Sequence, residues 1–217
     1  MKTVNLKNML NLRSLAIAAA IIVSMAFVSC EKENDDYIPQ NELSDDSMLK
    51  AGKSLPPGET SIAAIAIDAG FSELVGALFY VDGELGTELV DMFLNGTDQY
   101  TVFAPTNDAF QALYDSEDLE SLLGAEVNGI TDIPAEVVLN VLLYHVTDGR
   151  RAANSVVPKN NPKMIETLLE GTSFNVDKNL KIWAIGNTAN LVPPFVNISA
   201  SNGIIHVIDA VILPIEL

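Results

Sequence analysis

The sequence contains few of the residues that most often carry enzyme chemistry. Its 217 residues include one cysteine, one tryptophan and two histidines. No Gly-x-Ser-x-Gly turn, phosphate-binding glycine loop or clustered set of metal ligands is present. The sequence therefore predicts no catalytic residue, no metal and no cofactor, and we expect the protein not to be an enzyme. A hydrolase would require the histidines and carboxylates to converge in an open pocket.

Basic residues are also scarce, with 12 Lys and Arg against 29 Asp and Glu. Lys2, Lys7 and Arg13 all fall within the first 29 residues, which contain no acid. Without that segment the chain keeps 9 basic and 29 acidic residues, a formal net charge of −20. Nucleic-acid binding needs a basic surface that neutralises phosphates. We therefore expect no nucleic-acid partner, and anionic lipid headgroups would repel the protein surface.

The apolar run near the N-terminus is short for a membrane-spanning helix. It extends from Leu15 to Val28, 14 residues, whereas a spanning helix needs about 20. A basic start followed by such a run is typical of a secretory signal. The residues Phe27-Val28-Ser29-Cys30 resemble the lipobox of bacterial lipoproteins, in which the signal peptide is removed before an acylated cysteine.

Cys30 has no intrachain disulfide partner, because it is the only cysteine. The sequence thus predicts a signal peptide over residues 1–29 and acyl chains, palmitate among them, on Cys30. More than one acyl chain is needed for stable anchoring, since each buried methylene contributes only about 0.8 kcal/mol. The alternative is a free thiol buried in the core.

Residues 30–58 are predicted to form a disordered tether behind that lipid anchor. The segment is rich in acids, poor in apolar residues, and ends in Leu-Pro-Pro-Gly. Glu31-Lys32-Glu33 resembles surface-export signals of some Gram-negative lipoproteins, and a solvated spacer is the alternative. We expect a lipid-anchored outer-membrane protein exposed at the cell surface, with a periplasm-facing position as the alternative.

Residues 59–217 have the length of one domain. Ser61 is expected to cap a helix that ends at Gly70, and apolar spacing predicts helices over 74–79 and 85–93. Pro134 is expected to start a helix that is apolar almost all round. Runs rich in β-branched residues predict strands over residues 172–176, 180–184, 191–199 and 203–213. Helices followed by antiparallel strands predict an α+β fold.

The stretch Tyr100–Phe110 (YTVFAPTNDAF) predicts a strand that ends at Pro105 and leads into a helix. Thr106 or Asn107 can cap that helix, and Phe103 and Phe110 are expected to anchor both elements in one core. The stretch resembles the first signature box of the fasciclin-like domain family.

Two further stretches strengthen that resemblance. Leu143–Val146 (LYHV) resembles the family's tyrosine–histidine motif, and Asn202–Pro214 (NGIIHVIDAVILP) resembles its second signature box. The resemblance implies a wedge-shaped β-sandwich with several helices packed on it, a secreted or surface location, and adhesion or protein or glycan binding without a catalytic site. It gives a structural role to Thr101, Phe103, Ala104, Pro105, Thr106, Asn107, Phe110, Gly203, His206, Asp209 and Pro214.

Four residues within these boxes have expected roles of their own. Tyr144 and His145 are the candidate binding residues, because the resemblance links their motif to integrin binding in animal relatives; simple packing is the alternative. His206 shares a strand face with other apolar residues, so we expect a buried, hydrogen-bonded imidazole rather than a metal ligand. Asp209 is expected to accept backbone hydrogen bonds that tie the sheet to a loop.

Outside the boxes, the adjacent Arg150 and Arg151 are expected to form ion pairs. Trp183 and Phe195 are expected in the core, although they could stack on sugars if exposed. Together these observations predict a surface-anchored binding or adhesion lipoprotein that contacts extracellular or periplasmic protein or glycan. The alternative is a structural accessory lipoprotein of an outer-membrane complex for nutrient capture.

Overall fold

The computed structural model describes residues 56–216. Cys30, the predicted signal peptide and most of the predicted tether lie outside the described residues. No helix within residues 56–216 is both long enough and apolar enough to cross a membrane.

The order of the elements along the chain places most helices before most strands. The helices are α1 (Ile62–Asp68), α2 (Ser72–Leu85), α3 (Leu89–Leu94), α4 (Asn107–Tyr114), α5 (Glu117–Leu123), the short 3-10 helix η1 (Ile130–Asp132), α6 (Ala135–Tyr144) and α7 (Ala153–Val156). The strands are β1 (Tyr100–Pro105), β2 (Val146–Asp148), β3 (Lys163–Glu166), β4 (Ser173–Val176), β5 (Lys181–Trp183), β6 (Thr188–Asn190), β7 (Ile198–Ala200) and β8 (Gly203–Ile208).

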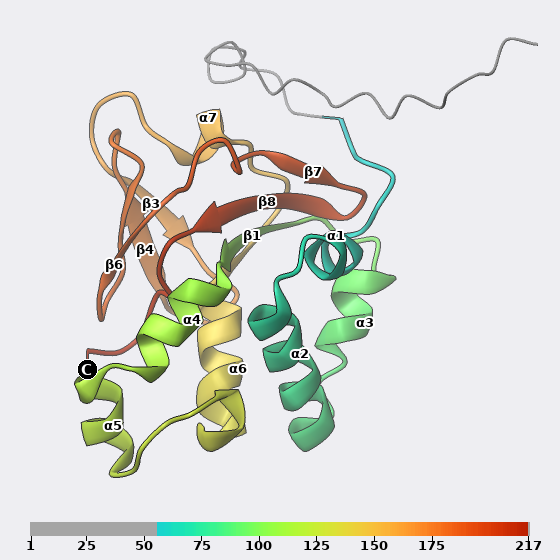
Figure 1. Ribbon diagram of the computed structural model, residues 1–217. Coiled ribbons are helices and arrows are strands. Elements are labelled where there is room, and N and C mark those ends of the chain that lie inside the picture. Colours follow the sequence, from blue (N-terminus) through green and yellow to red (C-terminus); the bar gives the residue numbers. More distant parts are fainter. Residues whose placement is uncertain (1–55, 217) are drawn as a thin grey trace, which may run out of the picture. The chain divides into compact units, whose positions relative to one another are not determined.

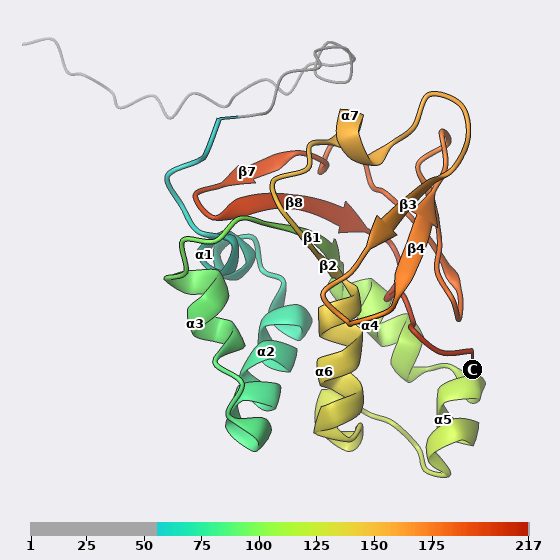
Figure 2. The same cartoon turned by 180° about the vertical axis from the view of Figure 1, so that it is seen from behind.

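The strands form two four-stranded sheets. The first has the order β2-β1-β8-β7 and the second the order β3-β4-β5-β6. Helices α2 to α6 lie together below the first sheet in Figure 1, and the reverse view in Figure 2 shows the same arrangement. This combination of a helical layer with two sheets confirms the α+β prediction.

Two apolar cores lie on opposite faces of the first sheet. Val102 and Ala104 of β1 belong to the core shared with the helices, whereas Phe103 belongs to the core between the two sheets. The prediction that Phe103 and Phe110 anchor one core is therefore wrong, because Phe110 packs on the helical side. Successive side chains of a strand point to opposite faces, so a strand with a layer on each side serves both cores.

The centre of the first sheet is a parallel pair, β1 with β8, flanked by antiparallel pairs at both edges. The prediction of antiparallel strands holds for the edges and fails at this centre. Tyr100 aligns with Gly203, Phe103 with His206, and Pro105 with Ile208. The two stretches that resemble signature boxes thus lie side by side over their whole strand length.

Several element boundaries differ from those that the sequence predicts. The strand expected over 203–213 ends at Ile208, and within the range expected over 191–199 a strand forms only at its end, as β7, after β6 has ended at Asn190. A cis peptide bond joins Pro193 and Pro194 between those two short strands. The second predicted helix continues to Leu85, so α3 begins only at Leu89.

The N-terminus of α1 is capped from a distant part of the chain. Ser61 occupies the N-cap position, but its side chain makes no capping hydrogen bond. Instead, the buried Asn202 side chain accepts a hydrogen bond from the Ile62 N–H at 2.8 Å and donates one to the Phe93 carbonyl at 2.9 Å. One amide therefore fastens α1 and α3 to the turn before β8.

The chain enters the domain beside the edge of the first sheet, where Arg150 holds it. The guanidinium donates to the Pro56 carbonyl at 2.9 Å and to the Ala200 and Gly203 carbonyls at 2.8 and 2.6 Å. The Gly58 N–H also donates to the Ala200 carbonyl. Arg150 thus donates hydrogen bonds to backbone oxygens. The sequence-based prediction of ion pairs did not include this interaction.

At Gly203 the backbones of β1 and β8 approach each other so closely that there is no room for a side chain. A Cβ atom at this position would lie 2.1 Å from the Tyr100 carbonyl oxygen and 2.7 Å from Ile62 Cδ1. We expect Gly203→Ala to lower the free energy of unfolding by about 1–3 kcal/mol, because backbone must move to admit the methyl group. Gly83→Ala is the matched control: nothing lies within 4 Å of its Cβ position in α2, so it should add about 0.5–1 kcal/mol. Urea unfolding of both variants measures these values, and equal stability of the two would contradict the packing argument.

Candidate functional site

The turn from β1 into α4 is fixed by the side chains of two adjacent polar residues, Thr106 and Asn107. Thr106 caps α4 by accepting a hydrogen bond from the Ala109 N–H at 3.2 Å. Asn107 has another role, since its amide donates to the Gly70 carbonyl at 2.9 Å and accepts from the Glu73 N–H at 3.2 Å. Thr106 is therefore the cap, and Asn107 joins the turn between α1 and α2 to α4.

Thr101 is fully buried in β1 and organises the loop that follows β2. Its hydroxyl donates to the Gly149 carbonyl at 2.6 Å and accepts from the Arg151 N–H at 2.8 Å. Both partners belong to one loop, so this single hydroxyl sets the path of the chain directly after β2.

His145 terminates α6 inside the domain. Its Nδ1 lies 2.7 Å from the Val141 carbonyl, which can only accept, and its Nε2 lies 3.0 Å from the Ile212 N–H, which can only donate. The proton is therefore on Nδ1. Burial lowers the pKa of His145 to about 4, against an ordinary value of 6.5. The imidazole is a neutral link between α6 and the C-terminal segment.

Tyr144 is fully buried between the two sheets, beside His145 in sequence but in the other core. Its hydroxyl donates to the Ser173 carbonyl at 3.0 Å and accepts from the Ile185 N–H at 3.3 Å. Burial raises the pKa of this hydroxyl. Packing and hydrogen bonding account for the placement of both Tyr144 and His145, and a direct contact between either side chain and a partner stays a prediction.

His206 is buried in β8 and has the opposite tautomer. Nε2 lies 2.9 Å from the Arg151 carbonyl, and Nδ1 accepts from the Asn197 N–H at 3.2 Å. Burial lowers the pKa of His206 to about 4. Its ring packs 5.5 Å from the Phe103 ring, measured between centroids. Within residues 56–216, no three His, Cys, Asp or Glu side chains are grouped closely enough to hold a metal ion.

Asp209, just after β8, connects the two sheets. Its carboxylate accepts hydrogen bonds from the backbone N–H of Asn190 at 2.6 Å and from the side-chain amide of the same residue at 2.8 Å. Asn190 is the last residue of β6, an edge strand of the second sheet. The partner of Asp209 is therefore a strand end, rather than a loop.

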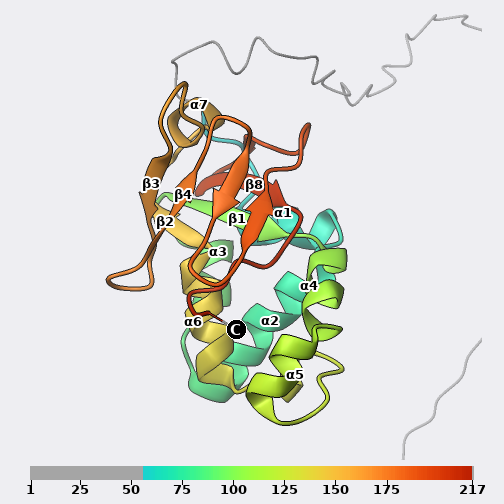
Figure 3. The same ribbon diagram turned by 90° about the vertical axis from the view of Figure 1, so that its left-hand side faces the viewer.

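The second sheet has an outer face on which four residues form a cross-strand row. Register aligns Met164 of β3, Asn175 of β4, Trp183 of β5 and Thr188 of β6, and all four are exposed. We call these four residues the outer-face row. Figure 3 views the domain from the side on which this sheet lies.

Trp183 dominates the outer-face row. Its side chain is 48% exposed, its indole Nε1 donates to Asp177 at 3.3 Å, and Lys181 Nζ lies 4.4 Å from the ring centroid. Phe195, in the segment before β7, is 54% exposed. The prediction that Trp183 and Phe195 belong to the core is therefore wrong. Alternation along a strand shows that a face exists, but it does not show whether another layer covers that face.

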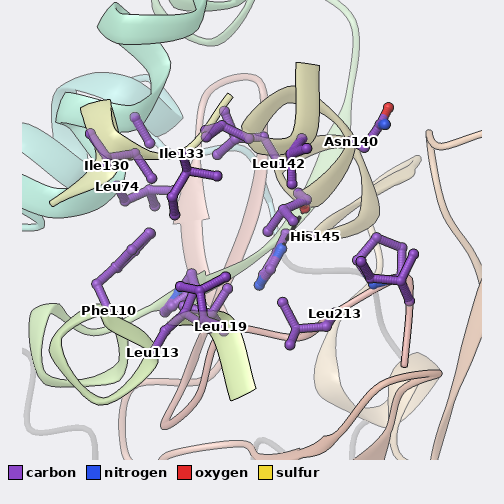
Figure 4. A pocket seen from close by; sticks show the side chains of 18 of the residues that line it. Leu74, Phe110, Leu113, Leu119, Ile130, Ile133, Asn140, Leu142, His145 and Leu213 are labelled. Carbon is purple, nitrogen blue, oxygen red and sulfur yellow. Dashed lines mark hydrogen bonds between the residues drawn. The ribbon is translucent and has the colours of Figure 1, made fainter. Parts of the chain in front are cut away.

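A second feature is an apolar cavity of about 250 Å³ in the helical layer. Side chains from α2, α4, α5, α6 and the segment after β8 line it, and Figure 4 shows Phe110, Leu119, Leu142 and His145 converging there. Pro105 and Pro214 also line it. Sequence reasoning missed the cavity, because apolar residues at helical spacing give the same pattern whether or not they fill the space between them.

Charge is distributed unevenly between the two parts of the domain. Residues 59–149 contain 17 Asp and Glu and no Lys or Arg, whereas residues 150–217 contain six Lys and Arg and five Asp and Glu. The first range holds α1 to α6 and the cavity's helices; the second holds the second sheet. The outer-face row therefore lies in a nearly neutral part of the chain, and the cavity in a strongly acidic part.

Because His145 and His206 are buried and neutral, we expect the free energy of unfolding to decrease in mild acid. Between pH 6.5 and about 4, the unfolded chain binds protons at these sites and the folded chain does not. The stability that the two neutral histidines contribute is thus fully present above about pH 6.5 and is lost as the pH falls toward 4. From pH 7 to 5 each histidine should contribute a loss of about 2 kcal/mol. Urea unfolding at both pH values should show that His206→Asn reduces this pH dependence by that amount; a pH dependence identical to wild type would contradict the neutral assignment.

Comparison with known proteins places these features in a family. The sequence profile of the fasciclin domain matches residues 70–214. Protein sll1483 of Synechocystis sp. is 34% identical over 72% of this chain and 76% of its own length.

Two longer proteins are also similar. The transforming growth factor-beta-induced protein ig-h3 of Oryctolagus cuniculus is 31% identical over 73% of this chain, which spans only 20% of that protein. A solved FAS1 domain pair from the insect cell adhesion molecule Fasciclin I aligns with a TM-score of 0.48 and 15% identity, covering 71% of this chain and 51% of that one. On the profile match and the similarity to protein sll1483, the chain belongs to the fasciclin domain family.

Proposed function

We propose that this protein is a surface-anchored binding module whose fasciclin domain contacts an extracellular glycan through the outer-face row of the second sheet. The observation that carries the proposal is the exposure of Trp183 in register with Met164, Asn175 and Thr188. Membership of a family associated with adhesion supports a binding role. The small number of residues that commonly carry enzyme chemistry agrees with this role.

The chemistry of this face fits a sugar. The Trp183 ring offers a flat apolar surface for the C–H face of a pyranose, and its hydrogen bond to Asp177 holds the ring in one orientation. The amide of Asn175 and the hydroxyl of Thr188 lie on the neighbouring strands, about 4.8 Å away on either side in strand spacing. Such groups both donate and accept, as sugar hydroxyls do.

A glycan suits this face better than a large protein surface does. A stable protein interface buries about 800 Å² on each partner around an apolar centre. On the outer-face row only Met164 and Trp183 are large apolar side chains, and their neighbours are polar. Binding of a protein rather than a glycan is therefore the competing result that the binding experiment must distinguish.

We further propose that acyl chains on Cys30 anchor the mature chain to the outer membrane, with residues 31–58 as the tether and the domain at the cell surface. The support is sequence-based: a lipobox-like segment that ends in the only cysteine, followed by an acidic polar stretch. Because the mature chain is strongly acidic, its own surface would be repelled by anionic headgroups, and the acyl chains would supply the membrane affinity.

Binding is tested with the mature chain carrying Cys30→Ser, which removes the acylation site. On an array of neutral and charged glycans we expect retained ligands, and titration of the best ligand should show at least tenfold weaker binding for Trp183→Ala, about 1.4 kcal/mol. Phe79→Ala is the control, because Phe79 is 57% exposed on α2 in the acidic part. Unchanged affinity of Trp183→Ala, or capture of matrix proteins without any glycan, would overturn the assignment.

The anchor is tested by fractionation and mass spectrometry in the native cells. Wild-type protein should sediment with the outer membrane and carry acyl mass on Cys30, whereas Cys30→Ser should appear in the soluble fraction. Protease added to intact cells should remove the domain if it faces outward. Protection until the outer membrane is permeabilised would place it in the periplasm. In-cell crosslinking to one membrane partner, with no glycan bound, would favour the accessory lipoprotein instead.

A further inference from the structure

The apolar cavity of the helical layer has the dimensions of a ligand site. Its volume is about 250 Å³, larger than the roughly 150 Å³ apolar cavity that admits benzene in an engineered protein. Most of the lining comes from four helices and the C-terminal segment, which ends near α5 in Figure 1. Convergence of elements from distant parts of the sequence makes it a feature of the whole helical layer.

The lining offers almost nothing for a polar ligand group to bind. His145 is the polar side chain that reaches the cavity wall, and both of its nitrogens are already hydrogen-bonded, to the Val141 carbonyl and the Ile212 N–H. Asn140 is exposed and lies at the edge of the group in Figure 4. The part of a ligand that enters the cavity must therefore be apolar, since an unpaired polar group would be buried there at a cost.

The large apolar lining residues that are exposed lie on α5 and on the C-terminal segment. Leu122 and Ile215 both line the cavity, and their side chains are 52% and 45% exposed. Two half-exposed apolar residues at the rim of an apolar cavity mark its mouth. A ligand whose apolar part fills the interior would leave its other end at this mouth.

The charged residues on the helices that line the cavity are all acidic. The elements that line the cavity carry acids, including Glu73 on α2, Asp108 on α4 and Glu136 on α6, and α5 begins with Glu117, Asp118 and Glu120. Residues 54–149 and 182–217, which contain every lining residue except Leu169, include no Lys or Arg. A carboxylate or phosphate at the mouth would be repelled, and an ammonium group attracted.

We propose that this cavity binds an alkylammonium amphiphile, with the alkyl chain inside the helical layer and the cationic end at the acidic mouth beside Leu122 and Ile215. The site is separate from the outer-face row of the second sheet, so it is a second binding function of the same domain. Two features together determine the ligand preference. The apolar interior favours an alkyl chain, and the electrostatic field of the acidic residues favours a positive charge at the end of that alkyl chain.

Three ligands that share one chain and differ in their head groups test the proposal. Decyltrimethylammonium, decanol and decanoate are titrated below their micelle concentrations into the Cys30→Ser mature chain in detergent-free buffer, by displacement of N-phenyl-1-naphthylamine. We expect affinity to fall in that order, with at least a tenfold difference between cation and anion at low salt that shrinks at high salt. Binding of decanoate as tight as that of decyltrimethylammonium, or no binding of any of the three, would overturn the proposal.

Variants then locate the site. Leu113→Trp and Val141→Phe each fill the cavity from a different helix, and either should abolish binding of all three ligands while circular dichroism stays that of the wild type. Trp183→Ala is the control and should leave binding unchanged, so failure here is distinguishable from failure of the glycan proposal. Combined Glu117→Gln, Asp118→Asn and Glu120→Gln should reduce the preference for the cation without affecting decanol. Unaltered binding in a folded, cavity-filled variant would place the ligand elsewhere and refute the assignment.

Discussion

The parallel pairing of β1 with β8 is the constraint on which the rest of the domain depends. It joins segments about a hundred residues apart and aligns Phe103 with His206. The first sheet can then cover the helices with one face and the second sheet with the other. At its N-terminal end Asn202 fastens α1 and α3, and at its C-terminal end Pro105 leads directly into the capped helix α4. Both cores are built outward from this pair.

Local chemistry allowed much of this architecture to be predicted. Apolar spacing predicted α2 and α6, Pro105 predicted the end of β1, and Thr106 was one of two expected caps for α4. What sequence reasoning missed depends on partners distant in the chain. Asn202 caps a helix 140 residues before it, and neither residue carries a local sign of that bond. The parallel pair and the division into two cores are equally non-local, because register is settled only when the layers assemble.

Sequence reasoning left Trp183 as an alternative that depended on exposure and missed the cavity altogether, for different physical reasons. Trp183 sits in a strand whose alternation is equally compatible with a covered or an open outer face, and only the position of the second sheet at the edge of the stack leaves it open. The cavity is a space between helices whose apolar faces are individually ordinary. The tyrosine–histidine motif, by contrast, was visible in the sequence and lies inside the domain, where His145 forms part of the cavity wall.

The hydrogen bond from Arg150 to Pro56 determines how tension applied to the N-terminal side of the chain would reach the domain. Any pull on the chain before Pro56 reaches the guanidinium and the Gly58–Ala200 hydrogen bond first, and through them the strands β7 and β8. The load therefore enters the domain at its most extensively paired sheet, while α4, α5 and the cavity lie outside the direct line of force. Tension applied to the chain before Pro56 would therefore load β7 and β8 before it loads the helices that surround the cavity.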